Sequence, residues 1–307
     1  MEPMNLFSVP EFILLGFSSQ PGMQLLLFAV FLAIYLAILF ENSLIFVLIR
    51  IDSHLHMPMY FFLANLSFLD ISYTTITVPQ MLLHLLSKEK NISYIGCIIQ
   101  MYIFLSLGIT ECILYAVMAY DRYVAICHPL HYTLIMSRSV CVKMAASSWV
   151  GGFFFAMVHT GITMRLPYCG PNEIKHFFCE VPAILKLACA DTRVTEVVVF
   201  VMGVILLMTP VFLILVSYVF ILVALRISAA EGRLKAFSTC TAHITMVTLF
   251  CGAAVFMYMH PASSYSPERD KYFSFFYNVV CALLNPLIYS LRNKDVKGAL
   301  VKLMGKK

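Results

Sequence analysis

Seven long apolar stretches, separated by short polar segments, make up most of the chain. Each stretch has the length needed to cross the hydrocarbon core of a bilayer, which takes roughly 20 residues at helical rise. Lipid offers backbone N–H and C=O groups no hydrogen-bonding partner, and the alternating pattern of a membrane barrel is missing. The pattern therefore predicts an all-α membrane protein, built as a seven-transmembrane helix bundle. The predicted helices cover residues 25–49, 59–83, 97–120, 140–164, 197–225, 236–260 and 272–291.

The composition supports this interpretation. Hydrophobic residues make up 61% of the chain and charged residues only 12%, whereas soluble domains have about 45–50% and about 25%. So little charge cannot cover a water-facing surface of ordinary size. We therefore expect membrane lipid to surround most of the surface, and we expect no nucleic acid partner.

The charges between the apolar stretches predict the orientation of the chain. If the N-terminus is outside, most of the 21 Lys and Arg residues lie on the cytoplasmic side with few acids beside them, as the positive-inside rule requires. The first residues have neither the basic start nor the apolar run of a cleaved signal peptide. We expect an extracellular N-terminus over residues 1–24, a membrane domain over residues 25–291 and a cytoplasmic tail over residues 292–307.

The tail after residue 291 reads RNKDVKGALVKLMGKK. Its apolar side chains, Val296, Leu300, Leu303 and Met304, share one face at helical spacing, and lysines occupy the other positions. This pattern predicts a short amphipathic helix on the inner leaflet, attracted by anionic lipid. A frayed basic tail is the alternative, because so short a helix is marginal by itself.

Several motifs follow one another along the chain. Residues 118–132 read MAYDRYVAICHPLHY and place an Arg at the cytoplasmic end of the third helix, where it can pair with its acidic neighbour or move to another partner. LHMPMYFFLANLSFLD opens the second helix, Ser217-Tyr218 lies in the fifth, KAFSTC (235–240) opens the sixth and NPLIYSLRN (285–293) closes the seventh. In their order and spacing over nearly the whole chain, these motifs resemble those of the odorant (olfactory) receptor family of rhodopsin-like G protein-coupled receptors.

The resemblance implies a function. Such a receptor binds small volatile molecules in the outer half of the bundle and activates a stimulatory olfactory-type G protein, which raises cyclic AMP. It also implies a multi-pass protein of the plasma membrane that reaches the surface with receptor-trafficking chaperones. The residues implied in the activation switch and the G protein contact are Asp121, Arg122, Tyr123, Tyr218, His243 and Tyr289.

An apolar stripe on the third helix recurs at helical spacing. Such a stripe by itself is more typical of helix packing, but the resemblance implies that it binds the odorant. Tyr258 and Asn278 are the predicted anchors for a polar head, and because no Lys or Arg is in the set, a carboxylic acid is the less favoured ligand. The predicted pocket residues are Met101, Phe104, Leu105, Gly108, Ile109, Cys112, Met202, Gly203, Leu206, Cys251, Val255, Tyr258, Phe275 and Asn278.

Four of the ten cysteines fall on the predicted outer side, at positions 97, 169, 179 and 189. Four cysteines in an oxidising environment suggest two disulfides, for which three connectivities are possible. The resemblance implies the pairs Cys97–Cys179 and Cys169–Cys189. The other six cysteines are expected to pack as small apolar residues. A metal site at His176 and Glu180 is disfavoured, because a disulfide-bonded cysteine between them cannot act as a thiolate ligand.

Three acids lie within the apolar stretches, where a charge near the bilayer centre costs roughly 2.5–3.5 kcal/mol. Asp70 and Glu111 match family positions that imply a possible sodium site, while a shared proton or a purely structural pair are the alternatives. Glu41 stands where the family usually has Gly. It either joins this cluster or is protonated. We expect no other cofactor.

Two further positions depart from the family pattern. Cys251 follows Phe250 where an aromatic residue is common, and Asn5-Leu6-Phe7 lacks the usual N-terminal glycosylation sequon. Asn91, in Asn-Ile-Ser, is the candidate glycosylation site instead.

Other classes of function fit the sequence less well. A transporter or channel commonly has two similar halves, and no repeat is evident here. A retinal-binding photoreceptor needs a lysine within the membrane, whereas Lys271 lies at the outer edge of the seventh helix. An enzyme is disfavoured because no nucleophile–base or metal constellation stands out. A chemosensory receptor of the same family in a non-olfactory tissue remains the alternative.

Overall fold

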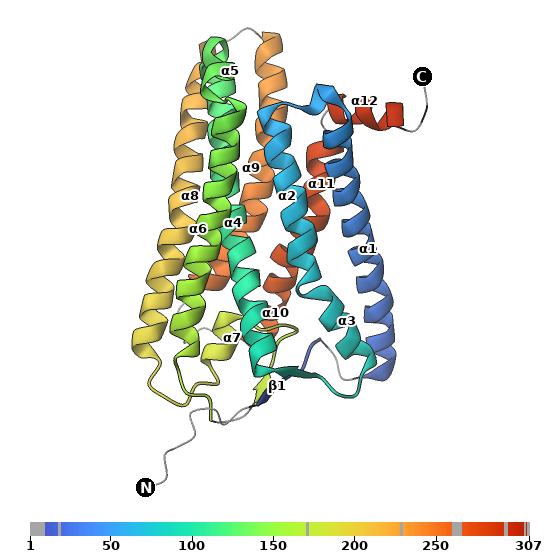
Figure 1. The fold of residues 1–307 in the computed structure, drawn as a ribbon, viewed down its shortest axis with the longest axis vertical. Coiled ribbons are helices and arrows are strands. Elements are labelled where there is room, and N and C mark those ends of the chain that lie inside the picture. Colours follow the sequence, from blue (N-terminus) through green and yellow to red (C-terminus); the bar gives the residue numbers. More distant parts are fainter. Residues whose placement is uncertain are drawn as a thin grey trace.

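The computed structural model describes residues 10–17, 20–169, 172–227, 230–259, 266–291, 294–303 and 305. In this part of the chain, seven helical segments are long and apolar enough to cross a membrane. They stand side by side as one bundle (Figure 1), which confirms the all-α seven-helix fold. The segments are Pro21–Ile51, Pro58–Leu86, Tyr94–Cys127, Arg138–Met164, Arg193–Arg226, Cys240–Tyr258 and Pro267–Tyr289.

The spanning segments are built from nine α-helices and one π-helical piece among the described residues. They are α1 (Pro21–Ile51), α2 (Pro58–Thr75), α3 (Val78–Leu86), α4 (Tyr94–Cys127), α6 (Arg138–Met164), α8 (Arg193–Ile227), α9 (Ala230–Tyr258), α10 (Pro267–Phe275), the π-helical η4 (Phe276–Val280) and α11 (Cys281–Leu291). Most run past the predicted bounds, because the apolar run measures the lipid thickness and a helix can continue beyond it.

Shorter elements connect the spans. They are η1 (Ser53–Leu55), η2 (Pro129–His131), α5 (Tyr132–Ile135), α7 (Val181–Leu185), α12 (Lys294–Leu303), and the strands β1 (Glu11–Leu14), β2 (Asn91–Ser93) and β3 (Glu173–Ile174). The side chains of residues 230–239 in α9, which include most of the KAFSTC motif, lie outside the described residues.

Two spans are interrupted where the hydrophobic pattern predicts continuous helices. The second span breaks between α2 and α3, where Pro79 occupies the first turn of the new helix and cannot donate a backbone hydrogen bond. The seventh contains η4, a wider turn that inserts one residue into the helical register. Both interruptions change which side chains face the centre of the bundle.

The helix α4 lies at the centre of the bundle and packs against α2, α6, α8 and α9 (Figure 1). Its contact with α6 is close because Gly152 has no side chain. A Cβ at that position would lie 2.0 Å from the Thr110 hydroxyl oxygen and 2.6 Å from the Ser106 carbonyl oxygen of α4. Small residues permit such close approach between membrane helices. Large apolar side chains instead cover the outer faces, for example Leu25 and Phe212, which are more than half exposed.

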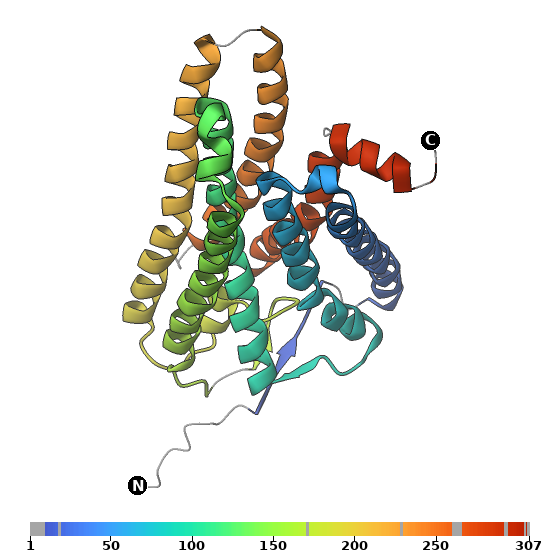
Figure 2. The same cartoon turned by 45° about the horizontal axis from the view of Figure 1, so that its top comes forward.

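The two ends of the bundle differ. One end, here called the disulfide end, contains both disulfides, Cys97–Cys179 and Cys169–Cys189, as the resemblance implied. A small sheet of order β2-β1-β3 covers it, with β1 antiparallel to β2 and parallel to β3. The opposite end, here called the Arg122 end, contains the loop helix α5 and the C-terminal α12 (Figures 1 and 2).

The predicted tail helix is present as α12, which leaves the bundle at a steep angle (Figure 2). Val296 is buried against the bundle, whereas Leu303 is half exposed. The Tyr60 hydroxyl donates to Asp295 at 3.0 Å, and the ammonium group of Lys302 lies 3.4 Å from Asp52. These contacts join the tail to α2 and to the first loop. Met304 lies outside the described residues.

The close contact at Gly152 yields a test of the packing. Gly152→Ala should lower the free energy of unfolding by about 1–3 kcal/mol, because the new methyl group must displace backbone of α4. The measurement is the thermal unfolding midpoint of the receptor purified in detergent. Gly161→Ala on the same helix is the matched control, since no atom lies within 4 Å of the added Cβ. Equal midpoints for the two variants would contradict this account.

Candidate ligand pocket and activation core

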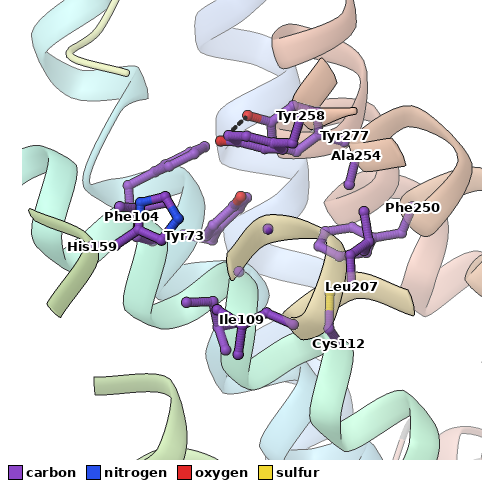
Figure 3. Close-up of a pocket in the computed structure, with 14 residues that line it drawn as sticks. Tyr73, Phe104, Ile109, Cys112, His159, Leu207, Phe250, Ala254, Tyr258 and Tyr277 are labelled. Carbon is purple, nitrogen blue, oxygen red and sulfur yellow. Dashed lines mark hydrogen bonds between the residues drawn. The ribbon is translucent and has the colours of Figure 1, made fainter. Parts of the chain in front are cut away.

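A cavity of about 80 Å³ lies within the bundle, on the disulfide-end side of its middle. Its walls come from α2, α4, α6, α8, α9 and η4, and they are almost wholly apolar (Figure 3). The lining residues are Tyr73, Phe104, Leu105, Gly108, Ile109, Cys112, His159, Gly203, Leu206, Leu207, Phe250, Ala254, Tyr258 and Tyr277.

Most of the predicted third-helix stripe lines this cavity. The predicted positions that do so are Phe104, Leu105, Gly108, Ile109, Cys112, Gly203, Leu206 and Tyr258. The others are placed elsewhere. Met101 packs in the apolar cluster beneath the sheet, Met202 and Val255 are half-buried outside the lining, and Phe275 contacts Phe17 and Phe31. Cys251 lies outside the lining, and its side chain hydrogen-bonds that of Cys112.

Asn278 lies outside the cavity lining, although its amide was a predicted anchor. Its Nδ2 donates to the Thr77 hydroxyl at 2.8 Å and so joins the seventh span to the break between α2 and α3. The π-helical segment explains the difference, because its extra residue rotates the helix and brings Tyr277 to the cavity. Periodicity alone assumes a regular helix and cannot reveal this shift.

Several lining residues were not predicted from the sequence. They are Tyr73, His159, Leu207, Phe250, Ala254 and Tyr277. Phe250 and Ala254 replace the predicted Cys251 and Val255, which corresponds to a rotation of the sixth span by one residue. His159 belongs to α6, a helix whose sequence carries no apolar stripe that would mark a pocket.

The carboxyl group of Glu180 joins the loop after α6 to the sixth and seventh spans. It accepts hydrogen bonds from the hydroxyls of Tyr258 at 2.8 Å and Ser274 at 2.7 Å, and from Tyr277. The hydroxyls of Tyr258 and Tyr277 also lie 3.4 Å apart (Figure 3). Burial raises the pKa of Glu180, and the three hydroxyl donors oppose that rise. Both tyrosines therefore present ring surface to the cavity and direct their protons to the loop.

His176 lies beside Glu180, with its Nε2 3.4 Å from a carboxyl oxygen. It is packed against the rings of Phe177 and Phe178. Burial, with a smaller contribution from the positive charge of Lys271, lowers the pKa of His176 to about 3. The imidazole is therefore neutral at physiological pH. The described residues contain no group of three or more His, Cys, Asp or Glu that could hold a metal.

The disulfide Cys97–Cys179 holds this loop in place. Cys179 precedes Glu180 directly, and its backbone N–H donates to the side-chain oxygen of Gln100 on α4 at 2.9 Å. Covalent and hydrogen bonds to one helix thus determine where the carboxyl group lies relative to the other two spans. The resemblance implied the disulfide, but the sequence did not indicate the contact of Glu180 with the hydroxyl groups.

Two buried acids meet in a polar network deeper in the bundle. Both oxygens of Asp70 accept from Asn285 Nδ2 at 3.0 Å, and the Tyr115 hydroxyl donates to Glu111 at 3.0 Å. The Tyr115 hydroxyl also lies 3.2 Å from Asn285 Oδ1, which joins the two halves. All four groups present oxygen atoms in a buried place, so this donor set fits a small hard cation as well as a shared proton.

Glu41 does not belong to this network. Its Oε2 has no hydrogen-bonding partner among the described residues, and its side chain is half-buried on α1. The neighbouring Asn42 instead donates to the backbone oxygen of Ala282 at 3.2 Å, and it thereby joins the first span to α11.

The predicted switch residues gather at the Arg122 end. The Tyr218 hydroxyl and His243 Nδ1 are 2.9 Å apart, which joins α8 to α9. The Tyr132 hydroxyl donates to Asp121 at 2.8 Å. In the described part of the chain Arg122 forms no ion pair within 4 Å, and its buried Nε has no partner. The Tyr289 hydroxyl is also buried and unpartnered there.

Two remaining predicted positions lie at the surface. The Tyr123 hydroxyl contacts His128 Nε2 at 3.2 Å at the Arg122 end. Asn91 lies in β2, and its side-chain amide donates to Glu11 of β1 at 3.1 Å. Its side chain is exposed, and glycosylation there stays a prediction.

The neutral His176 predicts an acid-sensitive contribution to stability. Its folded pKa lies below the value of about 6.5 for an unfolded chain, so only the unfolded state takes up a proton between pH 7 and pH 5. The free energy of unfolding should therefore fall by about 2 kcal/mol over this range, less any opposite contribution from Glu180. His176→Gln should weaken this pH dependence of the thermal midpoint.

The exposed His131 provides the control. The pH dependence that His176→Gln loses should be retained in His131→Gln. An unaltered slope in His176→Gln would show that the imidazole is not held neutral by its surroundings.

Known proteins resemble this chain over its whole length. The olfactory receptor family model matches residues 31–307. The human protein named Olfactory receptor 2A12 is 51% identical over 97% of this chain and 96% of its own, and the mouse Olfactory receptor 5AR1 is 48% identical over 100% and 99%. The crystal structure of squid rhodopsin has the same fold, with a TM-score of 0.73 at 17% identity over 94% of this chain and 87% of its own. The chain therefore belongs to the olfactory receptor family, whose members are seven-span membrane receptors and not enzymes.

Proposed function

We propose that this chain is an odorant receptor that binds small, mostly apolar volatile molecules in the cavity and activates a stimulatory olfactory-type G protein. The observation that carries the proposal is the buried cavity of about 80 Å³ lined by aromatic and aliphatic side chains, within the bundle of an olfactory receptor family member. Such a cavity suits a small ligand that gains affinity mainly from the removal of apolar surface from water. Activation of adenylyl cyclase would then raise cyclic AMP.

The proposed orientation has the disulfide end outside the cell. Disulfides persist in oxidising surroundings, and both disulfides lie at that end. Basic residues such as Arg50, Arg122 and Lys302 gather toward the other end, in agreement with the positive-inside rule. We therefore propose a plasma membrane protein with an extracellular N-terminus and a cytoplasmic C-terminus. Trafficking chaperones are the proposed helpers for surface delivery.

Ligand binding would be coupled to the Arg122 end through the sixth span. Phe250 lines the cavity, and its ring lies 5.7 Å from that of Tyr115. Two helical turns farther along the same helix, His243 contacts Tyr218. A ligand can shift this helix only if it binds the active arrangement more tightly than the resting one. Contacts with Phe250 and Ala254 on the moving helix supply that difference in the proposed mechanism.

The Arg122 end would bind the G protein when the sixth span moves outward. Separation of Tyr218 from His243 would release two buried polar groups. Arg122 Nε and the Tyr289 hydroxyl, which have no partner among the described residues, would be available to pair with them. The buried position of Arg122 in the resting arrangement supports its role as a group exposed by activation. Whether the tissue is olfactory or another one does not change this mechanism.

We also propose a sodium ion between Asp70 and Glu111. A bound cation would neutralise the charge of one carboxylate. Such a charge is costly within the membrane. Asp70, Glu111, Asn285 and Tyr115 are the residues that would hold it. Hydrogen bonds already connect them, because Asn285 Nδ2 donates to Asp70 and the Tyr115 hydroxyl lies near oxygens of Glu111 and Asn285. A shared proton would serve the same electrostatic need.

Arg122→Ala tests the proposed signalling. The variant should lose at least about 90% of the cyclic AMP response to an odorant panel, because the guanidinium group is the proposed partner of the active state. Cells should carry an olfactory-type G protein and trafficking chaperones, with surface receptor quantified by an N-terminal epitope. Arg50→Ala, an exposed arginine at the same end, should retain the response. A full response of Arg122→Ala at equal surface level would refute the mechanism.

Sodium dependence tests the ion site. Replacement of sodium by N-methylglucamine should raise odorant potency in receptor membranes by about tenfold if the ion stabilises the resting state by about 1.4 kcal/mol. Asp70→Asn should remove this difference. Glu41→Gln should keep it, because Glu41 lies outside the network. Equal potency of the unmodified receptor in both salts would exclude sodium and favour the shared proton.

A further inference from the structure

The cavity contains two polar groups that none of the interactions described above satisfies. His159 on α6 is 4% exposed and lines the cavity (Figure 3). Its Nδ1 is buried and has no hydrogen-bonding partner among the described residues. Tyr73 on α2 also lines the cavity and is buried, and its hydroxyl takes part in none of the hydrogen bonds described above. A buried polar atom without a partner is costly, typically about 1–3 kcal/mol, so such an atom at a cavity wall indicates a ligand.

The state of the imidazole decides which ligand group suits it. A neutral imidazole has one donor and one acceptor nitrogen, and a charged one is disfavoured among apolar walls. The ring hydrogen-bonds the backbone of Val199 on α8. A backbone carbonyl only accepts, and Nδ1 has no partner. The proton is therefore on Nε2, and Nδ1 is left as an acceptor that needs a donor.

The other two tyrosines at the cavity wall, Tyr258 and Tyr277, offer no such donor. The hydroxyl protons of Tyr258 and Tyr277 are directed to Glu180. Tyr73 can donate one proton, and its ring is held by stacking on Phe104 at 4.5 Å between centroids. The cavity thus combines one free hydroxyl with one free acceptor, which matches the donor and acceptor of a single hydroxyl group.

We propose that His159 and Tyr73 form a subsite for a ligand hydroxyl, so that the preferred odorants are alcohols or phenols. This inference rests on the proposed function and names its ligand class. The ligand O–H donates to His159 Nδ1, and the ligand oxygen accepts from the Tyr73 hydroxyl. A ketone or an ether can only accept, and it leaves His159 unsatisfied. The anchor therefore lies on the second and fourth spans, whereas the sequence pointed to Tyr258 and Asn278.

Matched ligand pairs test the subsite within one receptor. In the pairs hexan-1-ol and hexyl methyl ether, and phenol and anisole, the ether has a methyl group in place of the hydroxyl proton and therefore lacks the donor. The unmodified receptor should respond to each alcohol at about tenfold lower concentration than to its ether, the difference expected from one neutral hydrogen bond. His159→Phe keeps an aromatic ring without the acceptor and should reduce the ratio to about one. Because the ratio is measured in the same cells, the surface level cancels.

Two further variants make the test specific. Tyr73→Phe should weaken the alcohol and the ether alike, since both oxygens accept from Tyr73, and it should leave their ratio unchanged. His84→Phe is the matched control, because His84 also has an unpartnered Nδ1 but lies outside this cavity. It should keep the tenfold ratio. A ratio that survives in His159→Phe, or a preference of the unmodified receptor for the ethers, overturns the proposal.

A binding measurement separates the subsite from the signalling function. The purified receptor in detergent should gain thermal stability from each alcohol at lower concentration than from its ether, and a His159→Leu variant should lose the difference. Stabilisation by the alcohols without a cyclic AMP response would support the subsite and contradict the proposed signalling. If no member of either pair stabilises the unmodified receptor, the subsite is overturned.

Discussion

The absence of hydrogen-bonding partners in lipid is the constraint on which the rest of this structure depends. A polar side chain within a span is stabilised by a partner in the bundle, and the pairings formed here join spans far apart in the chain. Asn285 bonds Asp70, Asn278 bonds Thr77, and Asn42 reaches the backbone of Ala282. The seventh span is therefore tied to the first two, whereas the sixth is held at its two ends by Tyr218 and by Glu180 through Tyr258.

At the disulfide end, a loop outside the cavity lining forms hydrogen bonds with side chains of the cavity wall. Cys97–Cys179 holds the loop on the central helix, and the next residue, Glu180, accepts hydrogen bonds from three hydroxyl groups of the sixth and seventh spans. The hydroxyl protons of Tyr258 and Tyr277 are therefore not available to a ligand in the cavity. The polar character of the cavity thus depends on a residue outside its lining. In the proposed function the loop would influence ligand selection indirectly, because Glu180 determines which polar atoms of the cavity wall remain free.

The groups left unpaired are as informative as the pairs. Arg122 and Tyr289 at one end, and His159 at the cavity, are buried with polar atoms that have no partner among the described residues. In a medium without water such groups raise the free energy of this arrangement. A ligand or a second conformation that supplies the missing hydrogen-bonding partner is then favoured. The same physical effect would act on ligand binding at the cavity and on activation at the Arg122 end.

The sequence by itself determined the number of spans, the family, the tail helix and most of the central stripe on α4, because the lengths of apolar runs and the spacing along one helix are local properties. The tertiary structure decided which faces meet. The π-helical segment changes the register of the seventh span, which brings Tyr277 to the cavity and takes Asn278 away from it. Such a change of register depends on packing between helices, and a period of 3.6 residues cannot reveal it. His159 lies on a span with no marked stripe, and only its place in the bundle identifies it.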